Sequence, residues 1–355
     1  MRRGTLVLAA AVLLAACGHP LIPPGSLAPP PAAPRAIPPL RTPFLGVDLY
    51  ALGNYPAKQV EADGERTLGY IRNVLRADAV GIVWNFYAPS RQADAVGATG
   101  ATLSPSNVAI LTRIAERDHL QVEYRPLIFV PSQADSWEGL ISPASPSRWL
   151  DSYYRAELPY LRQAQRLRVS EFVTETEMHD LNASPLWAPF FARVARVYRG
   201  AVSYAAWDND YLERRPVLLP APYLGMDMYR RLQLGPEATQ AQVASRFAYW
   251  FGLIPAPVLR RTAIEETGIQ ARAGAYADPA NLLLPGVPDD AVQARWYTAA
   301  CQTVARFRLR GVFFWKVDLT DVPARPATSL STFEGRTGAA AISACASLLR
   351  HPGRR

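Results

Sequence analysis

Short apolar runs alternate with longer segments whose apolar residues recur at helical spacing along most of the chain. The runs are rich in Val, Ile, Phe and Tyr, which is typical of buried strands. We expect strands at Phe44–Tyr50, Ala79–Tyr87, Leu120–Ile128, Glu171–Glu177, Ala201–Trp207, Tyr223–Tyr229, Arg260–Glu266 and Gly311–Lys316. The amphipathic stretches between them predict helices, among them Asn107–Arg117, Leu150–Leu167, Pro189–Tyr198, Thr239–Gly252 and Asp290–Phe307.

Eight strands alternating with helices predict a fold of the α/β class, a (β/α)8 TIM barrel that forms one catalytic domain. The body from residue 44 to 349 is long enough, because such a barrel typically needs about 250 residues. An open, doubly wound sheet is the structural alternative. No G-x-G-x-x-G follows the first expected strand, which argues against the nucleotide-binding version of that alternative.

The first 16 residues predict a secretory signal. Arg2 and Arg3 precede an apolar run from Leu6 to Ala16, which is far shorter than the roughly 20 residues of a membrane-spanning helix. The sequence Leu-Ala-Ala-Cys that ends at Cys17 resembles the bacterial lipobox, whose cysteine is lipidated after cleavage. An ordinary signal peptide is the alternative. The lipobox implies an extracytoplasmic protein that a lipid anchors to the bacterial membrane or cell envelope.

A proline-rich segment separates the signal from the body. Residues 18–43 contain ten prolines and no acidic residue, so we expect residues 17–43 to form an extended, unpacked tether behind the lipidated cysteine. Residues 350–355 are expected to form a short basic tail.

The net charge of +8 suggests nucleic acid or a membrane surface as a partner. However, residues 44–349 hold 31 basic and 30 acidic residues, so the body is nearly neutral and the excess lies at the two ends. The distribution therefore predicts no nucleic-acid partner. At 49% hydrophobic residues, the chain is also not disordered.

Chemistry in a (β/α)8 barrel belongs at the C-terminal ends of the strands. The expected strand ends carry aromatic residues, amides and two glutamate clusters: Trp84, Asn85, Tyr87, Thr176, Glu177, Trp207, Asp208, Tyr229, Glu265, Glu266 and Trp315. Glycoside cleavage needs two carboxyl groups, and sugar rings pack on Trp and Tyr. No Gly-rich phosphate loop or set of metal-binding acids appears in the sequence, so no metal or organic cofactor is implied.

Several pieces of the body, in order, resemble glycoside hydrolase family 113, which belongs to a clan of retaining (β/α)8 enzymes and includes β-mannanases. The pieces are Gly46–Tyr50, Leu120–Pro126, Trp137–Gly139, Trp149, Thr176–Met178, Tyr204–Asp208, Gly225–Tyr229, Glu266–Gly268, Phe313–Trp315 and Phe333–Arg336. The resemblance implies that Glu177 is the acid/base and Glu266 the nucleophile. Retention would place their carboxyl groups about 5–5.5 Å apart.

We expect the following residues to bind substrate: Trp84, Asn85, Tyr87, Arg125, Trp137, Thr176, His179, Trp207, Tyr229 and Trp315. Tyr229 is also a candidate for orienting the nucleophile, and His179 for tuning the acid/base. Glu265 is expected to face away from Glu266. The family usually has Gly where this chain has Glu175, and we predict that Arg125 pairs with this extra carboxylate inside the barrel.

Cys301 and Cys345 form either a disulfide or two buried thiols. The sequence thus predicts an extracytoplasmic retaining glycosidase that acts on β-linked hexose polymers or oligomers, mannan-type substrates first. The alternative is a non-catalytic carbohydrate-binding lipoprotein on a degenerate barrel. Sugar chains are the expected partner in either case.

Overall fold

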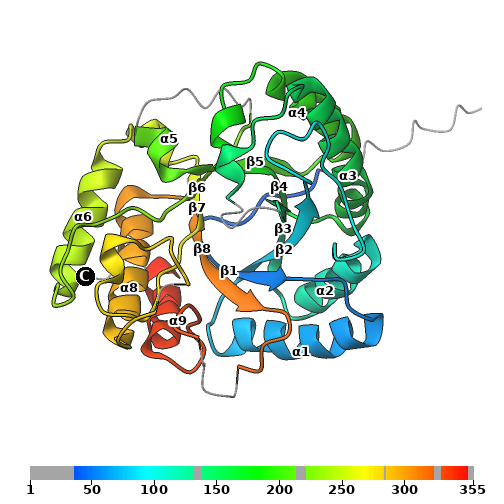
Figure 1. Ribbon diagram of the computed structural model, residues 1–355. Coiled ribbons are helices and arrows are strands. Elements are labelled where there is room, and N and C mark those ends of the chain that lie inside the picture. Colours follow the sequence, from blue (N-terminus) through cyan, green and yellow to red (C-terminus); the bar gives the residue numbers. More distant parts are fainter. Residues whose placement is uncertain (1–35, 132–136, 213–220, 284, 324–328, 351–355) are drawn as a thin grey trace, which may run out of the picture. The chain divides into compact units, whose positions relative to one another are not determined.

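Each of eight parallel strands pairs with the next strand along the chain, and the eighth pairs with the first, so that the sheet closes into a barrel (Figure 1). Helices follow the strands and surround the barrel, and the predicted (β/α)8 fold is confirmed. This computed structural model describes residues 36–131, 137–212, 221–283, 285–323 and 329–350, without the side chain of Glu175.

The strands are β1 (Phe44–Ala51), β2 (Ala79–Tyr87), β3 (Gln121–Phe129), β4 (Glu171–Thr176), β5 (Ala201–Trp207), β6 (Leu224–Asp227), β7 (Thr262–Glu266) and β8 (Gly311–Asp318). The α-helices of the described residues are α1 (Ala57–Asn73), α2 (Pro105–Arg117), α3 (Pro146–Leu167), α4 (Trp187–Val197), α5 (Asp208–Leu212), α6 (Gln240–Gly252), α7 (Ala256–Leu259), α8 (Asp290–Phe307) and α9 (Thr337–Arg350). Short 3-10 turns lie at η1 (Glu138–Leu140), η2 (His179–Leu181) and η3 (Ala275–Ala277). The strand order places the ends of β4 and β7 across the barrel from each other.

Side-chain caps fix the start of some helices. The Ser104 hydroxyl accepts a hydrogen bond from the backbone N–H of Asn107 at the start of α2. Thr239 and Gln242 form a reciprocal capping box at the start of α6. Such caps satisfy the amide groups that have no partner within the helix, which explains why both helices begin within two residues of their predicted starts.

Strict alternation along the strands divides the barrel interior from the outer core. On β2, Gly81 lies against interior carboxylates, and Val83 packs with interior residues of neighbouring strands. Trp84, one position further, therefore points outward. Its side chain is fully buried, stacks on Tyr160 of α3 at 4.6 Å between ring centres and meets Tyr124 edge-on. The prediction that Trp84 binds substrate is wrong, because this indole is part of the core.

The barrel unit begins before residue 44. Ile37 and Leu40 are buried, and Leu40 packs with Phe44 and Phe313 inside the barrel. The expectation of an unpacked tether is therefore wrong for residues 36–43, because the apolar side chains between the prolines contribute to the core. The expected signal peptide, Cys17 and the expected tether up to residue 35 lie outside the described residues. Arg350 belongs to α9, so the expected basic tail shortens to residues 351–355, which are likewise not described.

A disulfide joins Cys301 on α8 to Cys345 on α9, with 5.8 Å between the Cα atoms. Both residues are buried, and the bond ties the last helix to the helix that precedes β8. In the part of the chain that the structure describes, no helix combines the length and the apolar character needed to cross a membrane.

Candidate active site

Two glutamates stand at the C-terminal ends of β4 and β7. Glu177 directly follows β4 in a left-handed backbone conformation with φ of 48°, and its N–H donates to the carbonyl of Ala205 on β5 at 2.7 Å. A non-glycine residue rarely adopts this conformation, and such residues are frequent in functional sites. Glu266 is the last residue of β7 and is 8% exposed, so it borders the open end of the barrel.

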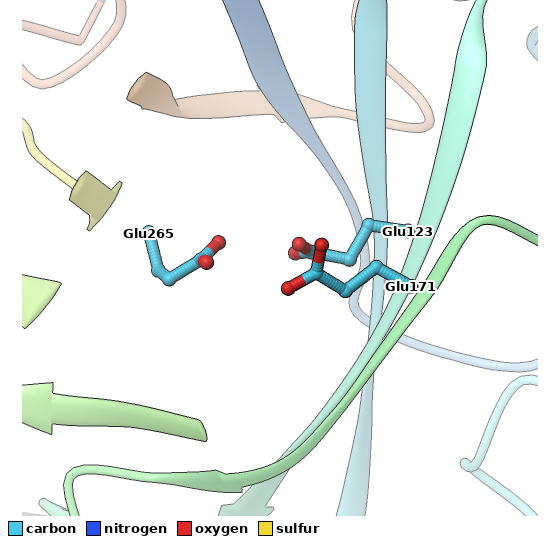
Figure 2. A group of neighbouring side chains, drawn as sticks. All are labelled: Glu123, Glu171 and Glu265. Atoms are coloured by element: carbon cyan, nitrogen blue, oxygen red, sulfur yellow. The ribbon is translucent and has the colours of Figure 1, made fainter. Parts of the chain in front are cut away.

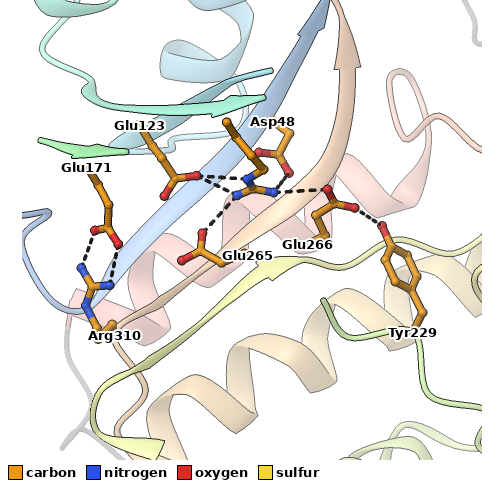
Figure 3. A network of polar contacts seen from close by, with 8 residues as sticks. Asp48, Glu123, Glu171, Tyr229, Glu265, Glu266 and Arg310 are labelled. Carbon is orange, nitrogen blue, oxygen red and sulfur yellow. Dashed lines mark hydrogen bonds and ion pairs between the residues drawn. The ribbon is translucent and has the colours of Figure 1, made fainter. Parts of the chain in front are cut away.

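Hydrogen-bond donors surround the carboxyl group of Glu266. The hydroxyl of Tyr229 donates to Oε2 at 3.1 Å, and Nη1 of Arg125 lies 3.4 Å from Oε1 (Figure 3). Burial raises the pKa of Glu266, while Arg125, Tyr229 and Lys316 lower it. These three partners favour the ionised form of Glu266. They also confirm the expectation that the Tyr229 hydroxyl contacts this carboxylate.

Glu177 has a different electrostatic environment. Burial raises its pKa well above the ordinary value, and the charges of Glu266 and Glu138 raise it further. A hydrogen bond from the indole N–H of Trp137 opposes this shift. Since desolvation and like charges both disfavour an ionised carboxyl group, Glu177 holds a proton more readily than Glu266, whose pKa burial also raises but Arg125, Tyr229 and Lys316 hold down.

Aromatic contacts hold Trp137 beside Glu177. Its ring stacks on His179 with 6.3 Å between the centres and meets Trp207 edge-on at 5.2 Å. His179 Nδ1 is in turn 2.6 Å from Oδ1 of Asp210. The other carboxylate oxygen of Asp210, Oδ2, accepts a hydrogen bond from Asn182. The loop after β4 is thereby fixed to α5, and Trp137, His179 and Trp207 form one wall of the site.

Arg125 lies beneath Glu266 and is fully buried. Its guanidinium contacts four carboxyl groups: Asp48, Glu123, Glu265 and Glu266. The expected contact with substrate is therefore not supported, because carboxylates enclose the guanidinium below the mouth of the barrel. The predicted pair with Glu175 lies outside the described residues.

The expectation that Glu265 faces away from Glu266 is wrong, because both carboxylates contact Arg125. Glu265 continues the inward alternation of β7 after Ala263, which packs inside the barrel. The pairing of β6 with β7 then shifts, so that Met226 pairs with Ile264 and Asp227 with Glu266. This irregularity turns Glu266 inward as well.

Below Arg125 the barrel interior holds further carboxylates. Oxygens of Glu123, Glu171 and Glu265 all lie within 4.8 Å of one another (Figure 2). Arg310 binds Glu171 through two hydrogen bonds of 2.9 and 2.6 Å (Figure 3). Carboxylates at this spacing are able to hold a cation, but here Arg125 and Arg310 already supply positive charge on either side of the group.

The remaining predicted site residues lie around the mouth. Asn85 and Tyr50 exchange hydrogen bonds of 2.7 and 3.0 Å, and Tyr50 also packs on Trp315 at 5.2 Å. Tyr87 is half-buried and meets Phe129 edge-on. Thr176 is buried, and its hydroxyl has no hydrogen-bond partner among the described residues.

A cavity of about 510 Å³ opens beside Tyr229. Trp207, Asp208, Arg230 and Trp250 are among the residues that line it. Arg230 is 3.3 Å from Asp208 and lies 4.2 Å over the Trp250 ring. The cavity therefore combines flat apolar surfaces with fixed polar groups, and Tyr229 in its lining contacts Glu266. This combination suits a ligand with both apolar faces and hydroxyl groups.

Two interior aspartates escaped the sequence-based selection of site residues. Asp48 contacts Arg125, and Asp227 has neither carboxylate oxygen hydrogen-bonded within the described part of the chain. Burial raises the pKa of both well above the ordinary value, and Glu266 raises both further. Asp48 and Tyr50 are two positions apart on β1, so both side chains point into the barrel. This alternation was the feature of the sequence that could have pointed to Asp48 as a site residue.

The sequence profile of Glycoside Hydrolase Family 113 matches residues 77–334. A structure of a GH113 β-1,4-mannanase in complex superposes with a TM-score of 0.74 and 15% identity, covering 87% of this chain and 99% of that one. A second structure of a GH113 β-1,4-mannanase gives 0.74 and 16%, covering 87% and 99%. The GH113 β-mannanase AaManA from Alicyclobacillus acidocaldarius, in complex with ManMIm, gives 0.72 and 17%, covering 87% and 98%. A search of curated proteins found no match.

Proposed function

Because the chain belongs to glycoside hydrolase family 113 and is a glycoside hydrolase, we propose that it cleaves β-linked, mannan-type glycans with retention of anomeric configuration. Solved family members that share its fold are β-mannanases, which supports this class of substrate. Family membership also favours an enzyme over the non-catalytic carbohydrate-binding lipoprotein.

The proposed reaction is a double displacement. Glu266 attacks the anomeric carbon while Glu177 gives its proton to the glycosidic oxygen, so that the leaving sugar departs and a glycosyl ester forms on Glu266. Glu177, now ionised, then takes a proton from water. The resulting oxygen attacks the anomeric carbon, and the Glu266 carboxylate leaves.

The observation that supports these roles best is the unequal environment of the two glutamates. Glu266 receives a hydrogen bond from Tyr229 and faces the Arg125 guanidinium. Glu177 has the Trp137 donor but faces the negative charge of Glu266. Two carboxyl groups whose environments separate their pKa values in this way are the usual signature of an acid and a nucleophile.

The walls of the site support binding of a sugar chain. Trp137 and Trp207 present aromatic surface beside Glu177, and the cavity lined by Tyr229 and Trp250 continues the surface away from Glu266. We propose that sugar units flanking the cleaved bond occupy these surfaces. Asn85 and Trp315, at the ends of β2 and β8, are proposed to contact sugar units on the other side of the bond.

We also propose that the enzyme is a lipoprotein held outside the cytoplasm by a lipid on Cys17. The support is the lipobox-like sequence that ends at this cysteine and the proline-rich segment after it.

Separate substitutions of the two glutamates test the proposed roles. We expect E177A to lower kcat/KM on β-mannan by about 10²–10⁴-fold, as loss of a general acid does. On an aryl glycoside with a good leaving group, azide should restore its turnover and give the β-glycosyl azide.

E266A should lose activity on both substrates, and azide should give the α-glycosyl azide from an activated substrate. E65Q, an exposed glutamate far along α1, is the matched control. Full activity of E177A or E266A on β-mannan would refute the assignment.

A further inference from the structure

A sealed layer of charged side chains fills the barrel beneath the proposed catalytic centre. It contains two guanidinium groups and five carboxyl groups, from Arg125, Arg310, Asp48, Glu123, Glu171, Glu265 and Glu266. All are less than 9% exposed. If every group were ionised, the layer would have a net charge of −3, which is unfavourable away from water. Some carboxyl groups of this layer must therefore be protonated, or the layer must hold a cation.

Arg125 is held along one edge and presents the other edge to Glu266. Its Nε and Nη2 donate to the same oxygen of Glu123 at 3.2 and 2.7 Å, and Nη2 also donates to Glu265 at 3.0 Å. Nη1, on the other edge, lies 3.4 Å from both Glu266 and Asp48. Glu123 and Glu265 therefore make the short contacts that fix the guanidinium, and the contact to Glu266 depends on them.

The other oxygens of this pair have no partner. Oε2 of Glu123 and Oε1 of Glu265 are buried and lack a hydrogen bond among the described residues, although the two carboxyl groups belong to the cluster whose oxygens lie within 4.8 Å (Figure 2). Two ionised carboxylates at this range repel each other in a dry interior. A single proton shared by the two carboxyl groups removes the repulsion, and Glu265 is a side-chain hydrogen-bond partner of Glu123.

A proton fits this position better than a metal ion. Glu171, the third member of the cluster, is already bound through both oxygens to Arg310, and Arg125 occupies the opposite side. A cation would therefore have a guanidinium on each side.

The fold also makes room for Glu265 inside the barrel. A Cβ atom on Gly225 of β6 would lie 2.2 Å from Cγ of Glu265 and 2.4 Å from the carbonyl oxygen of Tyr204. Neither contact is tolerable, so glycine at this position is required for the side chain of Glu265 to lie beside Glu123.

We propose that Glu265 and Glu123 share one proton as a carboxyl–carboxylate pair, and that this pair is the positioning device that holds Arg125 against Glu266. The pair does not touch substrate. The inference rests on the proposed function, because it assigns Arg125 the task of orienting the nucleophile.

The electrostatics of the layer agree with one shared proton. Burial and then Glu123 raise the pKa of Glu265 well above its ordinary value, and burial raises the pKa of Glu123 to about 7. The other charged or titratable groups that face the pair are Asp48 of β1, Arg125 of β3, Glu171 of β4, Tyr198 after α4, Tyr211 of α5, Asp227 of β6, Glu266 of β7 and Arg310 before β8.

Glutamine substitutions test the proposal, because an amide N–H replaces the shared proton. In E265Q the new amide donates to Glu123, and in E123Q it donates to Glu265, so each variant keeps one donor and one negative charge. We expect each to lower kcat by less than about tenfold with little change in KM. The double variant E123Q/E265Q removes both carboxylates that make the short contacts to Arg125 and leaves Asp48 and Glu266 beside it, and we expect it to lose at least about tenfold more than the two single losses combined. Arg125 is then no longer held against Glu266, so the pKa of Glu266 rises and the acid limb of kcat/KM moves to higher pH, which a purely structural role would not do.

Infrared difference spectroscopy on the unmodified enzyme tests the proton without any activity. The difference spectrum between the unmodified enzyme and E265Q at neutral pH should contain the band of one protonated, buried carboxyl group that E265Q lacks. Absence of that band, or single variants as damaged as the double variant, would overturn the proposal. Detection of a bound metal ion, with loss of stability on chelation, would overturn it in favour of a cation. Failure of the proposed function would appear separately, as absence of glycan hydrolysis with the infrared band intact.

Discussion

The donors around the two glutamates decide which carboxyl group holds a proton. Tyr229 and Arg125 contact Glu266, whereas Glu177 receives the indole N–H of Trp137 and lies in the field of Glu266. Each donor favours the ionised form of the carboxyl group that it contacts. Removing one donor should therefore move one limb of the pH–rate profile and leave the other in place.

Substituting Tyr229 with Phe should affect the acid limb. The variant removes the hydroxyl that donates to Glu266, so the pKa of Glu266 rises and the acid limb of kcat/KM moves to higher pH. A hydrogen bond to a charged group contributes about 1.5–3 kcal/mol, which corresponds to a loss of about 10–150-fold in kcat/KM. A pH–rate profile that keeps its acid limb in Y229F would contradict the role of this hydroxyl.

Substituting Trp137 with Phe should affect the alkaline limb. The ring is kept but the N–H that donates to Glu177 is lost, so the pKa of Glu177 rises and the alkaline limb of kcat/KM moves to higher pH. W207F is the matched control, since Trp207 contacts Trp137 edge-on and its replacement leaves the donor in place. The same shift in both variants would show that packing, rather than the hydrogen bond, determines the pH of the alkaline limb.

The sequence placed Glu177, Glu266 and Tyr229 at or just beyond expected strand ends, and the structure has them at or just beyond the ends of β4, β7 and β6. It failed for Trp84, which also lies near a strand end but belongs to the outward phase of β2. Whether a residue lies near a strand end is thus a weaker guide to site residues than the face of the strand on which its side chain lies. The structure establishes the phase of β2, since Gly81 and Val83 lie on its inner side.

At the scale of elements, irregular pairing shapes the site. The register of β4 with β5 shifts between Val173 and Thr176, just before Glu177, and the register of β6 with β7 shifts just before Glu266. Both glutamates therefore follow a break in strand pairing, and the second break allows Glu265 and Glu266 to face the same guanidinium. Period-two reasoning assumes regular pairing, so it was unable to predict this arrangement.

Helix α8 was predicted with the bounds that the structure has, Asp290–Phe307, because its apolar spacing is regular and Asp289 caps its start. Strand β6 was predicted too long, since the aromatic residues on either side of Leu224–Asp227 have strand-like character without strand pairing. Propensity identified the existence of these elements better than their limits.

The disulfide between α8 and α9 should stabilise the fold. It closes a sequence separation of 44 residues, and a loop of this length corresponds to about 4 kcal/mol in the chain-entropy treatment, within a usual range of about 2–4 kcal/mol. We expect C301S/C345S to lower the free energy of unfolding by about that amount in denaturant titrations. Reductant should lower the stability of the unsubstituted enzyme in the same way and leave the variant unaffected. Equal stability of the two proteins under oxidising conditions would contradict the prediction.

At the scale of the whole molecule, the positive charge lies at the termini. Residues 44–349 are close to neutral, whereas Arg2, Arg3, Arg35 and Arg41 precede them and Arg350, Arg354 and Arg355 follow them. A neutral glycan is consistent with such a body, and a polyanionic substrate would not gain from the terminal charge.

The proposed lipid anchor predicts how the protein fractionates. In a bacterial host with lipoprotein processing, the full chain should label with a fatty-acid analogue and sediment with membranes. C17A should lose the label and appear in the soluble extracytoplasmic fraction or remain unprocessed. Membrane association of C17A equal to that of the unsubstituted chain, with no label on either, would contradict a lipidated Cys17.

The measurement that tests the central claim most directly is proton NMR of a β-1,4-linked mannooligosaccharide during hydrolysis by the purified enzyme. The anomeric signal of the first product reports cleavage and stereochemistry together. A retaining reaction on Glu266 and Glu177 predicts that the β-anomer appears first and then mutarotates. Initial appearance of the α-anomer, or no hydrolysis of β-linked mannosides, would contradict the account.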